Sequence, residues 1–216
     1  MIALLVKEQI LENKIVAIIR GVDLDHMNDT VGALLKGGIN LVELAINHES
    51  DASISETLAS LKLVKRTYGD KVLLGAGTVL TTDQVKMAVD AGAEYIISPG
   101  KDLKVIEATK SLDKISIPGA LTPSEITEAY YAGADFIKIF PAGALGIDYI
   151  KAVRAPLAHI PLIAVGGVDM DNMTEFLDSG VVGVGIGISL VDTSAVYNEN
   201  YEKIERLARQ YVAQTL

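Results

Sequence analysis

The chain has 216 residues, of which 50% are hydrophobic, and this length suffices for one hydrophobic core. Its formal net charge of −9 argues against a nucleic acid or an anionic membrane as partner. The sequence holds no cysteine, which excludes disulfides and thiolate metal sites, and its three histidines have no metal-ligand spacing.

The chain begins with an apolar run, Met1–Val6, which ends at Lys7 and Glu8. This run is too short for the apolar core of a signal peptide, and no segment approaches the ~20 apolar residues of a membrane span. We therefore expect a cytoplasmic protein without a membrane partner. A first helix is predicted at about residues 4–13.

After this helix, short apolar segments alternate with segments of helical spacing. The recurring unit is a helix, a glycine and an apolar strand, as in Ala132-Gly133-Ala134-Asp135 before residues 136–140. Glycine is a common left-handed cap of a helix C-terminus. The predicted strands are Ile15–Arg20, Leu41–Ile46, Val72–Gly75, Tyr95–Ser98, Ile115–Ile117, Phe136–Phe140, Leu162–Val165 and Val182–Ile186. The predicted helices between and after them cover about residues 25–36, 51–68, 82–91, 103–110, 123–132, 147–155, 171–179 and 198–214.

Strands that are apolar throughout and alternate with helices indicate a parallel sheet buried on both faces. Eight such units in this length predict an α/β fold, a (β/α)8 TIM barrel with an extra N-terminal helix, formed by residues 1–216 as one domain. The alternative is a doubly wound open sheet. That fold favours a glycine-rich turn after the first strand, and Arg20-Gly21-Val22-Asp23 does not supply one.

A lysine interrupts the sixth predicted strand. Side chains alternate along a strand, so Phe136, Lys138 and Phe140 share one face. Burial between aromatic residues disfavours the charged ammonium, and a lysine with a lowered pKa is suited to act as a Schiff-base nucleophile. The alternative is a lysine on an exposed edge strand, or one that extends to solvent at the barrel end.

Glu43 is a second ionisable residue within an apolar strand. Its side chain lies on the same face of the strand as Leu41 and Ala45. Two predicted strands, one with Glu43 and one with Lys138, therefore each direct a titratable side chain toward the interior. A buried Glu43–Lys138 ion pair would explain both residues without a catalytic role. Buried pairs add little net stability, however, and a lysine beside a glutamate is also a nucleophile–base arrangement.

Glycines follow the last two predicted strands, as Gly166-Gly167 and as Gly185-Ile186-Gly187-Ile188-Ser189. In many barrels of this type the loops at these positions bind phosphate through backbone N–H groups. The alternative is that the glycines only permit tight turns. Arg20, at the end of the first strand, is a candidate cation for a substrate carboxylate or phosphate, or else part of a surface ion pair.

No metal site is predicted. The run Asp23-Leu24-Asp25-His26 contains metal-ligand residue types, but aspartate is also favoured at helix N-termini. We interpret this run as the solvated start of the second predicted helix.

Taken together, these segments resemble one family over nearly the whole chain. This is the class I 2-keto-3-deoxy-6-phosphogluconate (KDPG) and 4-hydroxy-2-oxoglutarate (KHG) aldolase family, including its 6-phosphogalactonate branch. The segments that carry the resemblance are residues 16–21 (Val-Ala-Ile-Ile-Arg-Gly), 42–44 (Val-Glu-Leu), 75–80 (Gly-Ala-Gly-Thr-Val-Leu), 97–100 (Ile-Ser-Pro-Gly), 117–119 (Ile-Pro-Gly), 137–142 (Ile-Lys-Ile-Phe-Pro-Ala) and 165–168 (Val-Gly-Gly-Val).

The resemblance implies a (β/α)8 barrel, a Schiff-base lysine, no cofactor or metal, and a homotrimer. It implies that Lys138 forms the Schiff base and that Glu43 is the acid/base. Substrate-binding roles are implied for the remaining matched positions, namely Arg20 and Thr78 on the pyruvate part or the hydroxyls, and Pro99 and Phe140 in the pocket wall.

Two positions depart from the pattern of the gluconate-type members. Asn47 stands on the loop after the second strand, where those members often carry an arginine for the substrate carboxylate, and it resembles the galactonate branch. The serine of the phosphate loop aligns with Ile188, and Ser189 comes one residue later. The expected phosphate contacts are therefore the backbone N–H groups of Gly166, Gly167, Gly187, Ile188 and Ser189.

The sequence thus predicts a carbon–carbon lyase that cleaves a 2-keto-3-deoxy-6-phospho sugar acid to pyruvate and glyceraldehyde 3-phosphate. One alternative is 4-hydroxy-2-oxoglutarate cleavage, which gives pyruvate and glyoxylate and needs no phosphate site. An alternative from another class is a phosphosugar isomerase or phosphate-binding barrel, with Glu43 as a base and Lys138 only as a charge.

Overall fold

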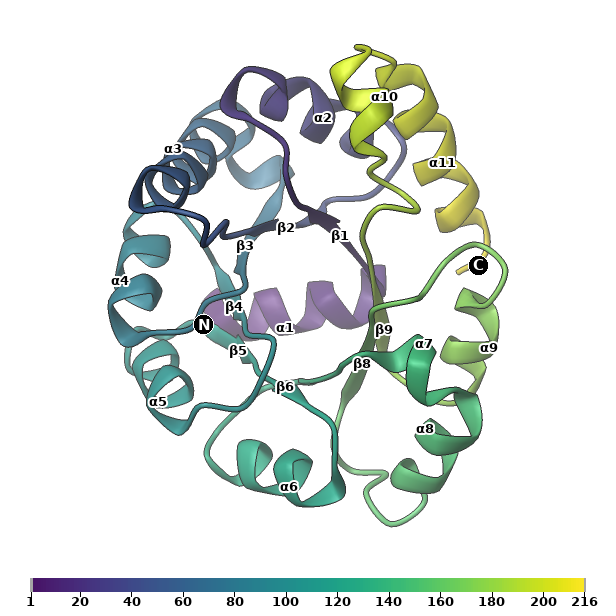
Figure 1. Cartoon of the computed structure of the whole chain (residues 1–216). Coiled ribbons are helices and arrows are strands. Elements are labelled where there is room, and N and C mark those ends of the chain that lie inside the picture. The colour runs from purple at the N-terminus through teal and green to yellow at the C-terminus, as the bar shows by residue number, and fades with distance from the viewer. Residues whose placement is uncertain (1, 216) are drawn as a thin grey trace.

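The computed structural model describes residues 2–215, with side chains from residue 4. Its strands form one parallel sheet in the order β5-β4-β3-β2-β1-β9-β8-β7-β6. The two outermost strands of this order, β5 and β6, follow each other directly in the chain, so the sheet curls into a barrel surrounded by helices (Figure 1). The predicted α/β barrel is confirmed. Met1 and Leu216, the ends of the predicted domain, lie outside the described residues.

The elements alternate along the chain as the sequence predicts. The strands are β1 (Ile15–Ile19), β2 (Leu41–Ala45), β3 (Leu73–Gly77), β4 (Tyr95–Ile97), β5 (Ile115–Ile117), β6 (Gly119–Ala120), β7 (Ile137–Ile139), β8 (Leu162–Val165) and β9 (Gly183–Ile186). The helices are α1 (Ile2–Asn13), α2 (Leu24–Lys36), α3 (Asp51–Tyr68), α4 (Thr82–Asp90), α5 (Leu103–Ser111), α6 (Pro123–Tyr131), α7 (Ala142–Leu145), α8 (Ile147–Arg154), α9 (Met173–Asp178), α10 (Thr193–Tyr197) and α11 (Tyr201–Ala213), with a 3₁₀ turn η1 at Gly69–Lys71.

The fifth strand of the barrel is divided, a feature that was not predicted from the sequence. Pro118 separates β5 from β6, because proline has no N–H to donate to a sheet. β5 pairs with β4 on one side, and β6 pairs with β7 on the other. The Lys138 N–H donates to the Pro118 carbonyl at 2.9 Å, so the barrel closes at this proline.

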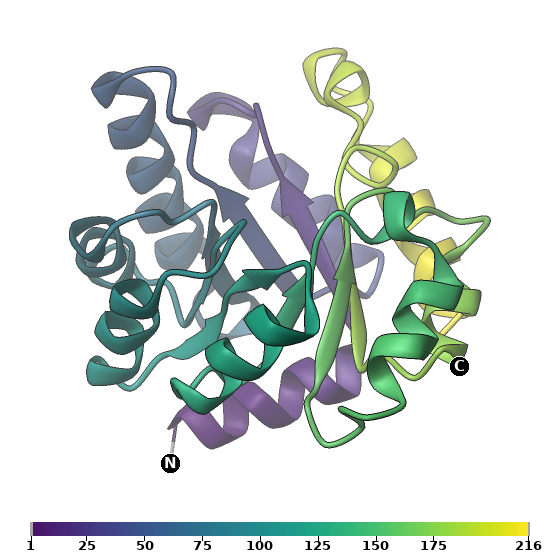
Figure 2. The ribbon, with the colours of Figure 1, turned by 60° about the horizontal axis from the view of Figure 1, so that its bottom comes forward.

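Alternate residues of the strands fill the barrel interior. One buried cluster contains Val16, Leu41, Leu73, Tyr95, Ile97, Ile115, Ile117, Phe136, Ile163 and Val165, together with Val6 and Ile10 of α1. Helix α1 lies across the end of the barrel from which the strands start, opposite the arrowheads (Figure 2). Side chains therefore fill the barrel interior next to α1, and the cavity described below lies at the opposite end, where the strands reach their carboxyl ends.

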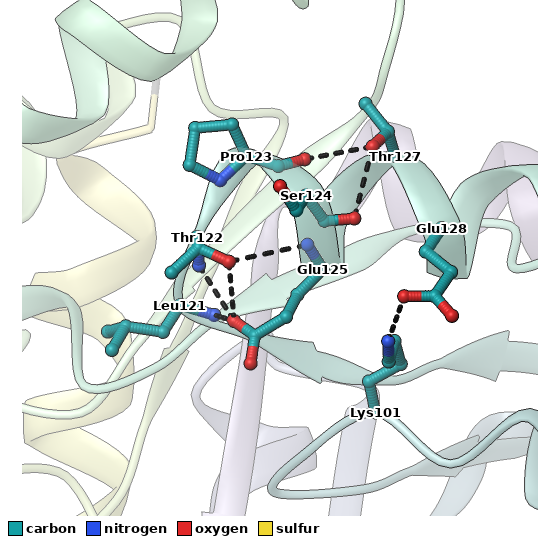
Figure 3. Close-up of polar contacts among 8 residues, drawn as sticks. All are labelled: Lys101, Leu121, Thr122, Pro123, Ser124, Glu125, Thr127 and Glu128. Carbon is teal, nitrogen blue, oxygen red and sulfur yellow. Dashed lines mark hydrogen bonds and ion pairs between the residues drawn. The ribbon is translucent and has the colours of Figure 1, made fainter.

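The outer helices are fixed by caps that the sequence encodes. At α6 the Thr122 side chain accepts a hydrogen bond from the Glu125 N–H, and the Glu125 carboxylate accepts from the N–H groups of Leu121 and Thr122 (Figure 3). This capping box satisfies N–H groups that would otherwise lack partners at the helix start. An ion pair between Lys101 and Glu128 ties the loop before α5 to the same helix.

Across residues 2–215, none of the helices combines the length and the apolar character that crossing a bilayer requires.

Candidate active site

A cavity of about 550 Å³ lies at the carboxyl ends of the strands. It is bounded by side chains and loops from β1, β2, β7, β8 and β9, which are brought together only when the barrel closes. Its lining consists of Ile18, Arg20, Glu43, Lys138, Phe140, Val165, Gly166, Gly167, Val168, Asp169, Gly185, Gly187, Ile188, Ser189, Val191 and Thr193. Nine of the residues proposed from the sequence for binding or catalysis are in this wall.

Lys138 projects into the cavity from β7. Its neighbours in register are Gly119 on β6 and Ile163 on β8, and only 6% of the residue is exposed. Its Nζ lies 4.8 Å from the centroid of the Phe140 ring. Burial lowers the pKa of the Lys138 amine, and the charge of Arg20 lowers it further, while Glu43 opposes the shift. The neutral amine, which is the nucleophilic form, is therefore more accessible than in an exposed lysine.

Glu43 enters the cavity from β2 and is 1% exposed. Burial raises the pKa of its carboxyl group, and the charges of Lys138 and Arg20 hold it lower. Its Oε2 has no hydrogen-bond partner in the described part of the chain. The ion pairs found among residues 4–215 do not include a Glu43–Lys138 pair, so the structural alternative considered for these two residues is not formed.

Arg20 lies on the cavity wall just after β1, and a neighbouring loop holds it in place. Its Nη2 donates to Thr78 Oγ1 at 2.9 Å, and His48 Nε2 donates to the Thr78 carbonyl at 2.7 Å. Thr78 has a φ of 56°, which is unusual for a β-branched residue. These contacts link the loops after β1, β2 and β3 and place the Arg20 cation in the cavity wall.

The glycine loops after β8 and β9 form the opposite wall. Gly166 and Gly167 have φ values of 86° and 75°, which glycine adopts without strain. The Gly143 N–H donates to the Gly166 carbonyl at 2.7 Å, and Ser189 Oγ donates to the Val168 carbonyl at 3.2 Å. The Ser189 hydroxyl therefore joins the two loops to each other. The Ile188 residue is 75% exposed.

Three of the predicted binding residues lie outside the cavity lining. Thr78 does not line the cavity itself, but its hydroxyl accepts a hydrogen bond from Arg20, which does. The Pro99 carbonyl packs against Gly119. Asn47 lines a separate cavity of about 160 Å³ beside β1 and α3, and its Oδ1 accepts from the Glu49 N–H.

Two polar residues of the cavity wall, Asp169 and Thr193, were not predicted from the sequence. Asp169 follows the Gly166-Gly167 pair by two residues, and Thr193 follows the Gly187 loop. Their positions in the sequence, close to the proposed phosphate-binding loops, could have identified them as cavity residues. By contrast, nothing in the sequence marks Ile18, a strand residue whose side chain faces the same cavity.

The acidic run before α2 behaves as a helix start. Asp23 accepts a hydrogen bond from the His26 N–H and caps α2. Among the described residues, no group of three or more histidine, aspartate or glutamate side chains is placed to hold a metal ion.

Residues 6–207 match a protein-family model described as KDPG and KHG aldolase. The chain is 34% identical over 200 residues to 2-dehydro-3-deoxy-6-phosphogalactonate aldolase of Escherichia coli K12, covering 92% of this chain and 91% of that one. It is 30% identical over 207 residues to 2-dehydro-3-deoxy-phosphogluconate aldolase of Haemophilus influenzae, covering 95% and 94% of the two chains.

Solved structures show the same architecture. A structure of native KDPGal superposes with a TM-score of 0.83 at 33% identity and covers 93% of both chains. A KDPG aldolase of Legionella pneumophila, with pyruvate captured as a covalent carbinolamine, has a TM-score of 0.83 at 28% identity and covers 94% of this chain and 96% of the other.

Proposed function

The chain belongs to the KDPG and KHG aldolase family, and we propose that it is a class I aldolase that cleaves a 2-keto-3-deoxy-6-phospho sugar acid. The products are pyruvate and glyceraldehyde 3-phosphate. One observation carries the proposal: a lysine, Lys138, is 6% exposed in the cavity that also holds Glu43, and its pKa is lowered by burial.

Lys138 is the nucleophile in this proposal. The neutral amine attacks the C2 ketone of the substrate to give a carbinolamine, which loses water to form a protonated imine. The C3–C4 bond then breaks, its electron pair moves into the imine to give an enamine, and the C4 carbon leaves as the aldehyde. Protonation at C3 and hydrolysis of the imine release pyruvate and restore the amine. The imine is the electron sink, so the reaction needs no cofactor.

Glu43 moves the protons. As a carboxylate it takes the proton of the C4 hydroxyl while the C3–C4 bond breaks, directly or through a water molecule. As a carboxylic acid it returns this proton to C3 of the enamine, and it also transfers protons at the steps that form and hydrolyse the imine. A group that must act both as acid and as base works best with a pKa near the operating pH, and burial raises the pKa of Glu43 in that direction.

The remaining residues bind and orient the substrate. Arg20, held by Thr78, pairs with the carboxylate of the pyruvate part or with a hydroxyl, and Phe140 covers the reacting carbons. The phosphate lies against the backbone N–H groups of the loops at residues 166–167 and 187–189. Pro99 and Asn47, which are outside the cavity lining, act on the shape of the neighbouring loops.

The substrate of this proposal is the galactonate epimer. The 34% identical relative in Escherichia coli is named for phosphogalactonate, and Asn47 resembles that branch. The gluconate epimer and 4-hydroxy-2-oxoglutarate are the competing substrates. We also propose a cytoplasmic homotrimer, as the family resemblance implies, and the molar mass in solution tests the oligomer.

Borohydride reduction in the presence of pyruvate tests the reaction type. The expected result is a stable adduct with the mass of reduced pyruvate, located on the peptide that contains Lys138. Lys138→Met should form no adduct, whereas Lys86→Met, which changes an exposed lysine on α4, should react as the wild type does. A phosphosugar isomerase would give no adduct in any of the three proteins. Turnover of the two epimers and of 4-hydroxy-2-oxoglutarate then ranks the substrates.

A further inference from the structure

Two polar atoms in the barrel interior are buried and have no hydrogen-bond partner among the described residues: Glu43 Oε2 and the Tyr95 hydroxyl. Tyr95 is 0% exposed and belongs to the interior cluster below the cavity. A tyrosine hydroxyl buried without a partner destabilises a fold, and phenylalanine would fill the same space without this penalty. The groups around Tyr95 should therefore explain why this position carries a hydroxyl.

Strand register places these two residues close together. Glu43 on β2 pairs with Gly75 on β3, and Gly75 pairs with Tyr95 on β4. A Cβ atom at Gly75 would overlap the Tyr95 ring, and a Cβ atom at Gly77 would overlap the Glu43 carboxyl group. The two glycines point inward two residues apart, so their side-chain positions are separated by roughly 7 Å along β3. The tyrosine ring and the carboxyl group thus lie over successive inward positions of the same strand, and Glu43 is close enough for its charge to raise the pKa of Tyr95.

The charged groups that act on this pair come from different parts of the chain. Lys138 on β7 and Arg20 after β1 act on the Glu43 carboxyl group. Glu43 and Glu94 act on Tyr95, whose pKa is raised well above its usual value, first by burial and then by these negative charges. Below the barrel, Lys7 of α1 lies 5.8 Å from the centroid of the Phe136 ring. Tyr95 accordingly keeps its proton and can only act as a donor toward a carboxylate.

We propose that Tyr95 is a positioning residue for Glu43: its hydroxyl donates a hydrogen bond through one bridging water molecule to Oε2, and this bridge holds the carboxylate toward Lys138. The inference rests on the proposed aldolase function, because it assigns a partner to the acid/base of that reaction. A hydrogen bond to a carboxylate favours the ionised form. Tyr95 therefore sets the pH at which Glu43 becomes a base.

The test is the pH profile of kcat/KM for Tyr95→Phe, which removes only the hydroxyl. Loss of a hydrogen bond to a charged group should move the acidic limb of the profile to higher pH by about one unit. On that limb the rate should fall by roughly tenfold at fixed pH, and above it by less. The same change in a Glu43→Gln background should have no effect on either the rate or its pH dependence.

Tyr68→Phe is the matched control. The Tyr68 hydroxyl donates to the Asn28 carbonyl at 2.7 Å, outside the barrel interior. This variant also loses one tyrosine hydroxyl, and its pH profile should match that of the wild type. Thermal unfolding of all variants checks that the barrel is retained.

Two outcomes would overturn the inference. One is an unchanged acidic limb in Tyr95→Phe together with a higher melting temperature, which is the behaviour of a buried hydroxyl without a partner. The other is an equal loss of rate in the wild-type and Glu43→Gln backgrounds, which would mean that Tyr95 acts on packing. Borohydride trapping of pyruvate distinguishes a failure of the proposed role of Tyr95 from a failure of the proposed aldolase function. An adduct with an unchanged profile refutes only the role of Tyr95, and no adduct in the wild type refutes the aldolase function itself.

Discussion

The carboxyl group of Glu43 occupies the space that a Cβ atom at Gly77 would fill. Glu43 lies on β2, and Gly77 is the last residue of the neighbouring strand β3. The glycine thereby sets the position of the carboxyl group without facing the substrate cavity itself. The overlapping atoms are the end of a flexible side chain, so a residue larger than glycine would displace the carboxyl group and leave the barrel intact.

The first prediction follows from this relationship. In Gly77→Ala the carboxyl group must move by about 1 Å or more, and such a misplacement lowers turnover by roughly 100-fold. The melting temperature should change little. Gly100→Ala is the control, because a Cβ atom there meets no atom within 4 Å. Steady-state kinetics on the phosphorylated substrate measure the effect, and near-normal turnover in Gly77→Ala would exclude Glu43 as the acid/base.

The second prediction concerns Lys138→Met. The change keeps the length of the side chain and removes a buried charge, so the free energy of unfolding should stay within about 1–2 kcal/mol of the wild-type value or rise. Cleavage should fall below detection. Urea unfolding and turnover are measured on the same preparation. A variant with strongly reduced stability would indicate that the lysine serves the fold rather than the reaction.

The third prediction concerns pH and stability. The pKa of Lys138 is lowered from 10.5 by burial. Between the lowered pKa and 10.5 the unfolded chain binds more protons at this residue than the folded chain, so stability rises with pH. This contribution is fully present above pH 10.5 and is lost as the pH falls through the lowered value. The free energy of unfolding of the wild type, relative to Lys138→Met, should therefore increase as the pH rises toward 10.5.

Urea titrations of the two proteins at several pH values test this sign. Lys86→Met is a suitable reference, because Lys86 has a side chain that is 65% exposed. Parallel curves for the wild type and Lys138→Met would contradict the burial-based shift.

The fourth prediction concerns the phosphate. Asp169 lines the same wall as the glycine loops and places a negative charge there. Asp169→Asn should lower KM for the phosphorylated substrate by roughly threefold, since two unit charges roughly 7 Å apart in water interact by about 0.6 kcal/mol. KM for 4-hydroxy-2-oxoglutarate should stay unchanged. Asp171→Asn, outside the cavity lining, is the matched control, and equal effects of both changes would argue against a phosphate at this wall.

Substitutions of Gly167 are a poorer test of the same loop. Its φ of 75° strains any other residue, and a Cβ atom there would lie 3.1 Å from the Cα of Gly143. Ser189→Ala should alter the phosphate contact little, because the Ser189 hydroxyl donates to the Val168 carbonyl.

Much of the fold was predictable because its signals are local. Periodicity and helix caps located all eight predicted strands to within two residues of their observed ends. They also gave α3 its observed bounds, Asp51–Tyr68. The sequence does not predict the division of the fifth strand at Pro118, since a proline after an apolar run usually marks the end of a strand. Helices α7 and α10 have 4 and 5 residues, which is too short for a helical period to register.

The candidate site was predictable only in part, and the reasons are again physical. Lys138 and Glu43 are recognisable in the sequence because burying a charged residue within an apolar strand costs free energy, so such a residue usually has a specific role. Tyr95 gives no such signal, since a tyrosine in a strand is ordinary and only the structure reveals that its hydroxyl lacks a partner. Asn47 was placed from its motif, whereas its side chain is held by its own loop through the Glu49 N–H.

Helix α1 covers the end of the barrel where the strands begin, so we expect both products to leave from the carboxyl ends of the strands, one after the other. In the proposed reaction pyruvate stays bonded to Lys138, which is buried in the cavity, while the aldehyde fragment is already free of any covalent bond to the protein. We therefore expect the aldehyde to depart first and pyruvate last, in an ordered uni-bi scheme. Pyruvate should inhibit competitively against the sugar acid, and glyceraldehyde 3-phosphate noncompetitively. The slopes and intercepts of double-reciprocal plots, measured with each product as inhibitor, distinguish this order from random release.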